Sequence, residues 1–552
     1  MKTSSCAWLG PLALCLLLAV LHTWPLATNP AALSLNHNAD AQLNAWIMAW
    51  VAHQLPVSPA QLFQGNIFFP ARDTLAFSEP LLVPALAGAP LAWLGGSPVL
   101  VHNLMVLLGL TLTALAGYAL VFAWTHDRAA GLLAGSMLAF NTHTLTRLAH
   151  VQGLHLYGLA LALLATDRLL TRSRWRDAWW LSGWMVAMAY TSGYLAVFAT
   201  VMIAVALGTR VADWRPRARE VISRLALASA AAFAAVLPLY LPYRRVALEQ
   251  QMVRALDSVA EFSASLPGYL ASSGTLHFSL WSWRFFRDPV DSFFPGVVGI
   301  SLAGYAVYSS FKSPSSTPAQ VDAGVSRRRI GMLVAIAMTG LVLSLGTRTP
   351  VYGWLYAVFP PMQGLRAAAR FGNLFLLGAA ALAGLGLAAF RARHPSSRYG
   401  VAVAAALVVV ANVESVRAPF TYRRFDGVPG VYRFLKDEPG RVVLAEVPFY
   451  PREAAFENAE YVLNSTAHWR PLMNGYSGYT PGTYSAYAVD FWHFPEERAI
   501  RAMRNAGVTN VMVHLDRFGN DADSVSDRVG ARPDFEPVAI GSRGRLRLYR
   551  LR

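Results

Sequence analysis

Residues 98–124 read PVLVHNLMVLLGLTLTALAGYALVFAW and contain no Asp, Glu, Lys or Arg. A run of this length exceeds the roughly 17–25 apolar residues with which an α-helix crosses a bilayer. The chain is 55% hydrophobic and only 14% charged, whereas about 25% of residues are charged in an ordinary soluble protein. Similar apolar runs recur through the first three quarters of the chain, at 6–24, 151–170, 224–243, 371–390 and 399–413. These features predict an α-helical polytopic membrane protein.

The distribution of arginine predicts how the chain threads the membrane. The net charge is +16, and nearly all of it is arginine, because the chain has only three lysines. The arginines cluster in short loops between apolar runs, which is typical of cytoplasmic loops and not of a basic nucleic-acid groove. The basic loops lie at 128, 172–176, 210–219, 312–329 and 391–398, and they alternate with loops at 25–79, 142–150, 190–193, 244–293 and 346–370.

This alternation predicts a cytoplasmic N-terminus, about eleven spans and a C-terminus on the outer side. Two segments are ambiguous, so the predicted number of spans is eleven to thirteen. Residues 81–94 are apolar but contain Pro84 and Pro90, so they either re-enter the membrane or lie in its interface. Residues 177–209 are expected to form a tight pair of helices around 190–193. The first apolar run is longer than a signal-peptide core, which favours an uncleaved anchor.

From about Val416 onward the composition is that of a soluble domain. Residues 441–447 (RVVLAEV) and 510–514 (NVMVH) are predicted to be buried strands, and 497–506 a helix. Residues 545–551 (RLRLYRL) largely alternate polar and apolar side chains, which is typical of an edge strand. These elements predict a small α/β domain, with a β-rich lid as the alternative.

The chain is therefore predicted to have two domains. Residues 1–415 form a transmembrane domain with a first outer loop at 25–79 and a polar cytoplasmic linker at 313–325. Residues 416–552 form the extracytoplasmic α/β domain. Both cysteines lie in the first apolar run, so the sequence offers neither a disulfide framework in the loops nor a cysteine metal site outside the membrane.

The first outer loop contains two acidic residues that are candidates for chemistry. Asp40 is expected at the N-cap of a helix within 36–55, and the apolar residues that follow it recur at helical spacing. Such a helix is expected to lie on the membrane surface with its tryptophans at the headgroups. Asp40 serves either as a cap alone or in catalysis. Glu79 borders an apolar segment, where an acid is costly unless it is paired or functional.

Two further outward segments carry candidate residues. Arg147, His150 and Gln152 lie in one short stretch, RLAHVQ, where His150 is either a base or a structural histidine. Arg366 and Arg370 have the i, i+4 spacing of one helix face. Two guanidiniums at the outer interface suit a phosphate or diphosphate, or they anchor the chain to lipid headgroups in general.

Several common chemistries find no support. The sequence contains no GxxxxGK[ST] and no GxGxxG, so nothing indicates an ATP-driven pump or a dinucleotide enzyme. It contains no HExxH zinc motif either. The spans contain few ionisable residues at mid-membrane, which disfavours a transporter.

Together these segments resemble the GT-C class of membrane glycosyltransferases, and more narrowly its bacterial GT-C-like members. The resemblance covers nearly the whole chain and depends on the order and spacing of short motifs. The matching phrases are DAQLNAWIMAW (40–50), NIFFPARDTLAFSE (66–79), LAHVQ (148–152), SFFPG (292–296), GLRAAARF (364–371), HWRPLMNGYSG (468–478) and AGVTNVMVH (506–514). Many members have Gly-Asp where this chain has Ala39-Asp40, and the acid is retained.

The resemblance implies a sugar transferase that uses a polyprenyl-phosphate-linked donor on the outer face of the cytoplasmic membrane. A single displacement of the lipid phosphate would invert the anomeric centre. The acceptor would be a glycan, a lipid or a protein, and the other partners membrane lipids. By position in the motifs, Asp40, Glu79 and His150 are the expected catalytic residues. The expected substrate-binding residues are Asn44, Arg147, Gln152, Arg366 and Arg370. The first outer loop lacks the acidic DxD pair of many members, so no metal ligand and no cofactor is assigned, and a divalent metal stays an open but unsupported alternative.

Two alternative functions remain open from the residues alone. One is a transporter or flippase for a lipid-linked glycan. The other is a GT-C scaffold that has kept its acids for capping and has a structural or binding role. The aromatic stretch 469–484 either stacks on sugar rings or is a packed loop, and the sequence slightly favours the packed loop.

Overall fold

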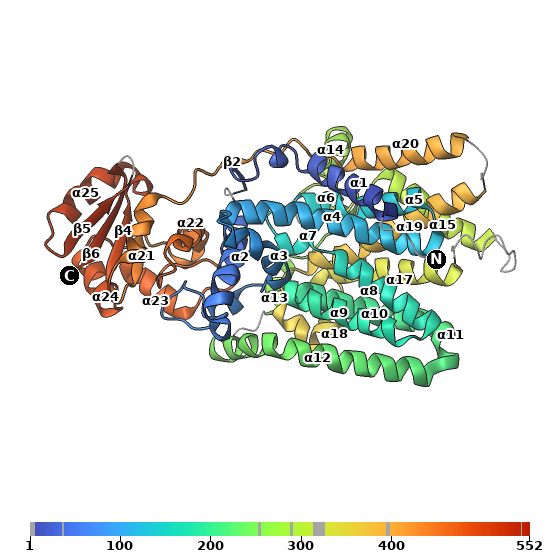
Figure 1. Ribbon diagram of the computed structural model, residues 1–552, viewed down its shortest axis with the longest axis horizontal. Coiled ribbons are helices and arrows are strands. Elements are labelled where there is room, and N and C mark those ends of the chain that lie inside the picture. The colour runs from blue at the N-terminus through green and yellow to red at the C-terminus, as the bar shows by residue number, and fades with distance from the viewer. Residues whose placement is uncertain are drawn as a thin grey trace. The chain divides into compact units, whose positions relative to one another are not determined.

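The computed structural model describes residues 6–35, 38–251, 255–287, 291–312, 326–393, 398–541 and 544–552. The predicted linker at 313–325 lies outside these residues. The fold is mostly helical (Figure 1). The chain packs into two compact units, one made of Met1–Thr28, Val106–Pro238 and Val253–Thr421, the other of Asn29–Met105, Leu239–Met252 and Tyr422–Arg552. The predicted domain boundary at residues 415 and 416 stays a prediction.

The first unit is built from helices. The longer ones are α1 (Cys6–His22), α4 (Pro98–Thr125, which begins in the second unit), α5 (Arg128–Ala139), α8 (Tyr157–Arg172), α9 (Trp175–Thr191), α10 (Gly193–Thr209), α12 (Ala218–Glu249, which ends in the second unit), α15 (Val297–Lys312), α17 (Arg327–Ser344), α19 (Gly372–Ala392) and α20 (Arg398–Ser415). Short helices lie between them: α6 (Thr142–Leu145), α7 (Val151–Leu154), α11 (Val211–Trp214), α13 (Leu256–Glu261), α14 (Thr275–Leu280) and α18 (Pro350–Val358). The predicted helical pair at 177–209 is confirmed, since Ser192 alone separates α9 from α10.

Helix α19 forms the centre of this unit, packed against α5, α15 and α17. Small residues let these helices approach closely. A Cβ atom at Gly384 would lie 2.9 Å from the carbonyl oxygen of Ala130, and one at Gly378 would lie 2.8 Å from that of Leu333. Close approach through glycine is typical of helix pairs in membranes, where van der Waals packing drives association. Glycine at these positions therefore determines how closely the helices of the core approach one another.

Three helical stretches of the described chain are long and apolar enough to cross a membrane: Pro98–Thr125, Val211–Glu249 and Ala368–Ala392. Five shorter helices are also apolar. In the apolar window of Val211–Glu249 only 17% of the residues are buried, and Phe233 is 68% exposed. So much exposed apolar surface suits a lipid environment rather than water. The expected eleven to thirteen spans and their orientation stay predictions.

A buried ionic cluster joins helices of the first unit. Asp167 is 1% exposed, and its carboxylate accepts hydrogen bonds from Arg210 (2.7 Å), Arg329 (3.0 Å) and the indole of Trp124 (2.9 Å). Two of the arginines that marked cytoplasmic loops in the sequence therefore also tie α17 and the end of α10 to α8.

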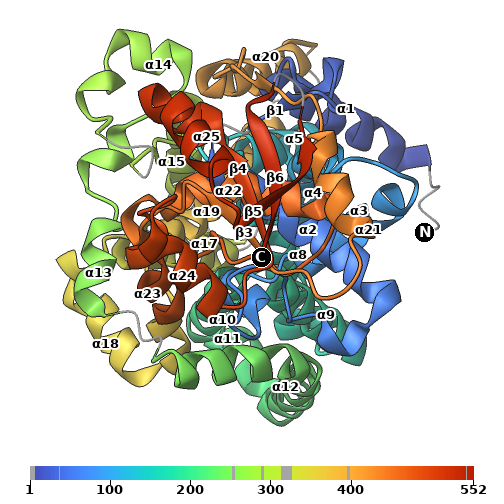
Figure 2. The same cartoon turned by 90° about the vertical axis from the view of Figure 1, so that its left-hand side faces the viewer.

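The second unit contains a mixed sheet in the order β3-β4-β6-β5, with β3 parallel to β4 and the other pairs antiparallel. Figures 1 and 2 show these strands as one group with helices α24 and α25 beside them. The strands are β1 (Leu33–Ser34), β2 (Arg423–Arg424), β3 (Leu444–Val447), β4 (Asn510–His514), β5 (Phe535–Ile540) and β6 (Leu546–Leu551). The helices are α2 (Ala39–Val57), α3 (Leu82–Trp93), α21 (Phe434–Asp437), α22 (Ala459–Asn464), α23 (Gly482–Phe491), α24 (Glu497–Asn505) and α25 (Ala522–Gly530).

The predicted α/β character of the C-terminal region is confirmed, with one error. Strands β3 and β4 and helix α24 lie where the sequence predicts them. Strand β6 was expected at the edge of the sheet, but it pairs with both β4 and β5. The two terminal strands of this sheet are β3 and β5, and β5 has a bulge between Pro537 and Ala539. Alternating side chains indicate a half-buried strand, and they do not show how many neighbours it has.

The first outer loop is joined to the C-terminal region by backbone hydrogen bonds. The amides of Phe68 and Phe69 donate to the carbonyl oxygens of Asn474 and Leu472, and the amide of Leu472 donates to Asn66. Leu472 in turn bridges to Leu444 of β3. The segments NIFFP (66–70) and PLMNG (471–475) therefore lie beside the sheet, joined to each other and to β3 by their backbones. Within the aromatic stretch 469–484, residues 472–475 are buried, and Gly482 begins helix α23. Whether the stretch stacks on sugar rings or packs against the membrane domain stays a prediction.

Helix α2 differs from its expected place on a membrane surface. Trp46 and Trp50 are 1% and 5% exposed, and their indoles donate to Asn66 (3.2 Å) and to the carbonyl oxygen of Leu62 (2.8 Å). The helix packs on α3 and α22. The prediction was wrong because an apolar helix face packs equally well on protein or on lipid, and periodicity does not tell the two apart.

Candidate functional site

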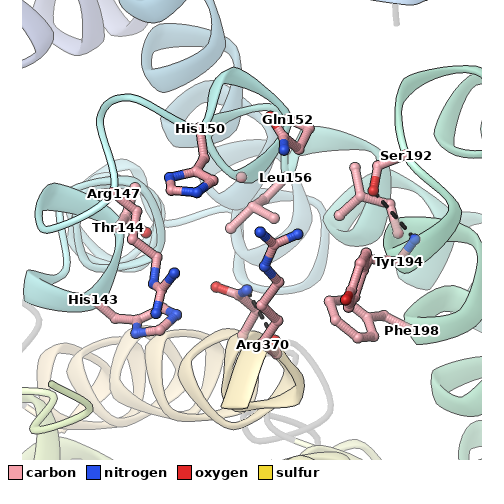
Figure 3. Close-up of a pocket in the computed structure, with 13 residues that line it drawn as sticks. His143, Thr144, Arg147, His150, Gln152, Leu156, Ser192, Tyr194, Phe198 and Arg370 are labelled. Atoms are coloured by element: carbon pink, nitrogen blue, oxygen red, sulfur yellow. Dashed lines mark hydrogen bonds between the residues drawn. The ribbon is translucent and has the colours of Figure 1, made fainter. Parts of the chain in front are cut away.

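A pocket of about 420 Å³, including its open mouth, lies within the first unit (Figure 3). No Asp or Glu occurs among the described residues that line it. The walls carry two guanidiniums, two imidazoles and two side-chain amides. The lining residues are His143, Thr144, Arg147, His150, Gln152, Gly153, Leu156, Ser192, Tyr194, Leu195, Phe198, Arg370 and Asn373. Four residues that the sequence singled out, Arg147, His150, Gln152 and Arg370, therefore meet at one place.

One wall is a chain of short turns between α5 and α8. Asn141 caps α6 by accepting a hydrogen bond from the amide of Thr144 (2.9 Å), and α6 ends after only four residues. The amide of Arg147 then donates to Thr144, and that of His150 donates to Arg147. Side chains of this segment converge on the pocket, as Figure 3 shows.

The opposite wall is formed by Tyr194 and Arg370. Ser192 caps α10 by accepting from the amide of Tyr194 (3.2 Å), which fixes the start of the helix. The guanidinium of Arg370 lies over the Tyr194 ring, with its Cζ atom 4.5 Å from the ring centroid. A cation over an aromatic face is stabilised by the ring quadrupole. The ring of Tyr194 therefore helps to hold the Arg370 guanidinium at the pocket wall.

Arg366 does not share a helix face with Arg370. It precedes the 3-10 helix η9 (Ala368–Phe371), and Leu365 and Ala367 on either side of it have non-helical backbone angles. The amides of Arg366 and Ala367 both donate to the hydroxyl of Tyr194, at 3.0 and 3.1 Å. The predicted i, i+4 pair is therefore wrong. Arg366 is exposed, lies over the ring of Phe262, and is not among the described residues that line the pocket.

His143 is a pocket residue that is not among the site residues predicted from the sequence. It is 2% exposed and stacks on Phe293 with 4.3 Å between ring centroids. Burial holds the pKa of His143 well below its usual value, and the positive charges of Arg147 and Arg370 and the ring of His150 lower it further. The ring is therefore neutral at physiological pH. The position of His143, four residues before Arg147, is the sequence feature that could have indicated its place in the pocket.

Asp40 belongs to the second unit, on the first turn of α2. It is not the N-cap: that residue is Asn38, whose side chain accepts from the amide of Asp40 (2.9 Å). The Asp40 carboxylate instead accepts a hydrogen bond from the hydroxyl of Tyr476 (2.8 Å). Because the capping role is filled by Asn38, the purely structural explanation of Asp40 as a cap does not hold.

The other two candidates of the outer loop also lie in the second unit. Glu79 is half-buried and follows Ser78, whose carbonyl oxygen accepts from the hydroxyl of Tyr243 (2.6 Å). Asn44, one turn after Asp40 on α2, is 3% exposed. Within the described residues no group of three or more His, Cys, Asp or Glu side chains has the arrangement to hold a metal ion. The roles of Asp40, Asn44 and Glu79 stay predictions.

Comparison with known proteins identifies the fold. No protein-family model and no curated protein sequence matches the chain. The arabinofuranosyltransferase AftD from mycobacteria has a similar structure, with a TM-score of 0.60 and 17% identity over 100% of this chain and 40% of that one. The oligosaccharyltransferase of Archaeoglobus fulgidus tethered to an acceptor peptide has a TM-score of 0.50 and 11% identity over 95% of this chain and 71% of that one. Both are GT-C glycosyltransferases. The chain thus has the GT-C fold, which is that of a membrane-embedded glycosyltransferase class.

Proposed function

We propose that this chain, which has the GT-C glycosyltransferase fold, moves a sugar from a polyprenyl-phosphate-linked donor to an acceptor on the outer face of the cytoplasmic membrane. One observation carries the proposal: the pocket that brings Arg147 and Arg370 together with His150 and Gln152, without a carboxylate among the described residues of its lining. Guanidiniums bind phosphate oxygens through paired N–H groups. The acceptor is a glycan, a lipid or a protein, and the C-terminal α/β domain is extracytoplasmic.

The charge change of the reaction explains why such a pocket would help. The donor is a phosphodiester with one negative charge, and cleavage of the bond between the anomeric carbon and the phosphate oxygen leaves its electron pair on the phosphate. The product is a phosphomonoester with two negative charges. Arg147 and Arg370 would therefore stabilise the transition state more than the bound donor, and this difference lowers the barrier.

The acceptor hydroxyl must lose a proton as it attacks the anomeric carbon. We assign that proton to the carboxylate of Asp40, because a partly desolvated carboxylate can act as a general base. The hydrogen bond from Tyr476 would orient it. Glu79 and His150 are the further candidates for acid or base. A single displacement of this kind inverts the anomeric centre. Asn44 and Gln152 would bind the sugar or the phosphate through their amides.

Release of polyprenyl phosphate tests the proposal. The purified full-length protein would be incubated with a panel of polyprenyl-phosphate sugars and acceptors, and the freed lipid phosphate measured. Asp40→Asn should abolish release. Asp426→Asn is the matched control, because Asp426 is 78% exposed and pairs only with the nearby Arg424 among the ion pairs of the described residues. Equal release by wild type and Asp40→Asn would refute the role of Asp40. Absence of release with every donor would refute the function.

A further inference from the structure

His143 combines features that a structural histidine rarely combines. It lines the pocket and is 2% exposed. Neither of its ring nitrogens has a hydrogen-bond partner in the described part of the chain. Buried polar atoms are normally paired, because an unpaired one costs about 1–3 kcal/mol. The stacking on Phe293 holds the ring in place without using either nitrogen.

The groups that face His143 are nearly all cationic or neutral. Arg147 and His150 come from the segment after α6, Arg370 comes from η9, and Tyr194 comes from α10. Phe293 packs on the ring face and carries no titratable group. Asp291, on the same segment as Phe293, accepts hydrogen bonds from the amide and hydroxyl of Ser265. In the protein without ligand, burial and two fixed positive charges therefore keep the imidazole of His143 neutral.

We propose that an anion enters this pocket together with a proton, and that His143 carries that proton. The inference rests on the proposed function, because the anion is then the phosphate of the lipid-linked substrate or product. A dianion between Arg147 and Arg370 offsets the two positive charges that disfavour protonation of His143. It also supplies the acceptor that the ring nitrogens lack. The proton passes from water to a ring nitrogen, and no other bond is made or broken.

The proton would distinguish product from donor. The donor phosphodiester carries one negative charge, which two arginines already exceed. The phosphomonoester carries two, and each added negative charge favours the protonated imidazole. The pocket would then gain positive charge as the phosphate gains negative charge. This coupling makes the pocket complementary to the charge that develops when the glycosidic bond breaks.

Sulfate is a suitable probe because it is a dianion throughout the neutral range and does not itself titrate there. Its binding to the full-length protein in detergent would be measured calorimetrically in two buffers with different ionisation heats, at about pH 7.5. We expect uptake of up to about one proton per sulfate, and an affinity that rises up to about tenfold for each unit of falling pH. His143→Gln should abolish the uptake. His126→Gln, which removes an exposed histidine of the same unit, should retain it.

The outcomes separate the inference from the function. Sulfate binding without proton uptake would overturn the role of His143 and leave the proposed function standing. Uptake that is lost in His150→Gln and kept in His143→Gln would overturn the assignment to His143. If neither sulfate nor polyprenyl phosphate binds, both proposals fall. The proton count of the wild type needs no variant. Should His143→Gln not fold, His143→Phe keeps an aromatic ring against Phe293 and removes the titratable group.

Discussion

The hydroxyl of Tyr476 donates a 2.8 Å hydrogen bond to Oδ1 of Asp40. The two residues are far apart in the chain, and the backbone ladder between 66–69 and 472–474 brings their segments together. A hydrogen bond to a charged carboxylate contributes about 1.5–3 kcal/mol. Tyr476 is therefore a positioning residue for the carboxylate to which we assign the acceptor proton.

Tyr476→Phe should lower the rate of sugar transfer about 10–100-fold, which corresponds to the loss of one such hydrogen bond. The acid side of the pH–rate profile should also move to higher pH, because the hydroxyl no longer favours the ionised carboxylate. Both effects should vanish when the change is made in Asp40→Asn, which a double-mutant cycle would show. A Tyr476→Phe protein that is less stable but keeps its rate and its pH profile would restrict Tyr476 to a structural role.

Arg370 and Arg366 are expected to differ, although the sequence treats them as a pair. Arg370→Ala removes a cation from the pocket and should lower the turnover number about 10²–10³-fold, as the loss of a transition-state donor does in other enzymes. Arg366→Ala should have a clearly smaller effect, because Arg366 is exposed over Phe262. Arg393→Ala is the matched control, since Arg393 is exposed and donates to Tyr305. Equal losses for Arg366→Ala and Arg370→Ala would restore the prediction from the sequence.

The difference between Arg366 and Arg370 shows that residue spacing alone does not predict whether a segment is helical. Arg366 and Arg370 have helical spacing, but the hydroxyl of Tyr194 accepts both amides at 366 and 367 and holds that segment out of a helix. The competing hydrogen bond comes from a residue about 170 positions earlier, so no window of sequence around 366 contains it. Asp40 is similar, since its short side chain suits a cap, but Asn38 two residues earlier takes that place.

Some predictions that depend only on neighbours in the chain are confirmed. The turn at Ser192 and the strands β3 and β4 follow from residue type and periodicity alone. The meeting of Arg147, His150, Gln152 and Arg370 could be anticipated in part, because each lies in a loop assigned to the same side of the membrane. What surrounds a buried residue could not be anticipated. The tryptophans of α2 and the histidine at 143 have the same local appearance whether they face lipid, water or protein.

Asp167 should be important for stability. It is 1% exposed and accepts from Arg210, Arg329 and Trp124. Asp167→Asn would remove the negative charge that Arg210 and Arg329 share, although Arg210 also pairs with Asp213, and breaking a buried ion pair on one side costs about 3–5 kcal/mol. We expect a clearly lower temperature of thermal unfolding in detergent. Asp426→Asn breaks a pair whose side chains are 82% and 78% exposed, and exposed pairs contribute little. An unchanged unfolding temperature for Asp167→Asn would mean that the cluster is not a structural tie.

His468 should make the second unit sensitive to acid. Burial lowers the pKa of His468 from 6.5 to about 3, with a further contribution from Arg470. Between these two values the unfolded chain binds a proton that the folded chain does not, so stability is complete above the unfolded pKa and falls as the pH drops below it. At about pH 5 this amounts to about 2 kcal/mol. His468→Phe keeps a ring beside Tyr432, on which His468 stacks, and removes the titration.

The comparison of slopes isolates this histidine from the other groups that titrate in the same range. Thermal unfolding would be followed by tryptophan fluorescence, since Trp469 is the next residue, in wild type and in His468→Phe between about pH 7 and about pH 5. The variant loses the hydrogen bond from the amide of Arg470 and should be less stable at the upper end of the range. Its stability should nevertheless fall less steeply with acid. Parallel curves for the two proteins would mean that His468 either takes up its proton in the folded state or is not buried there.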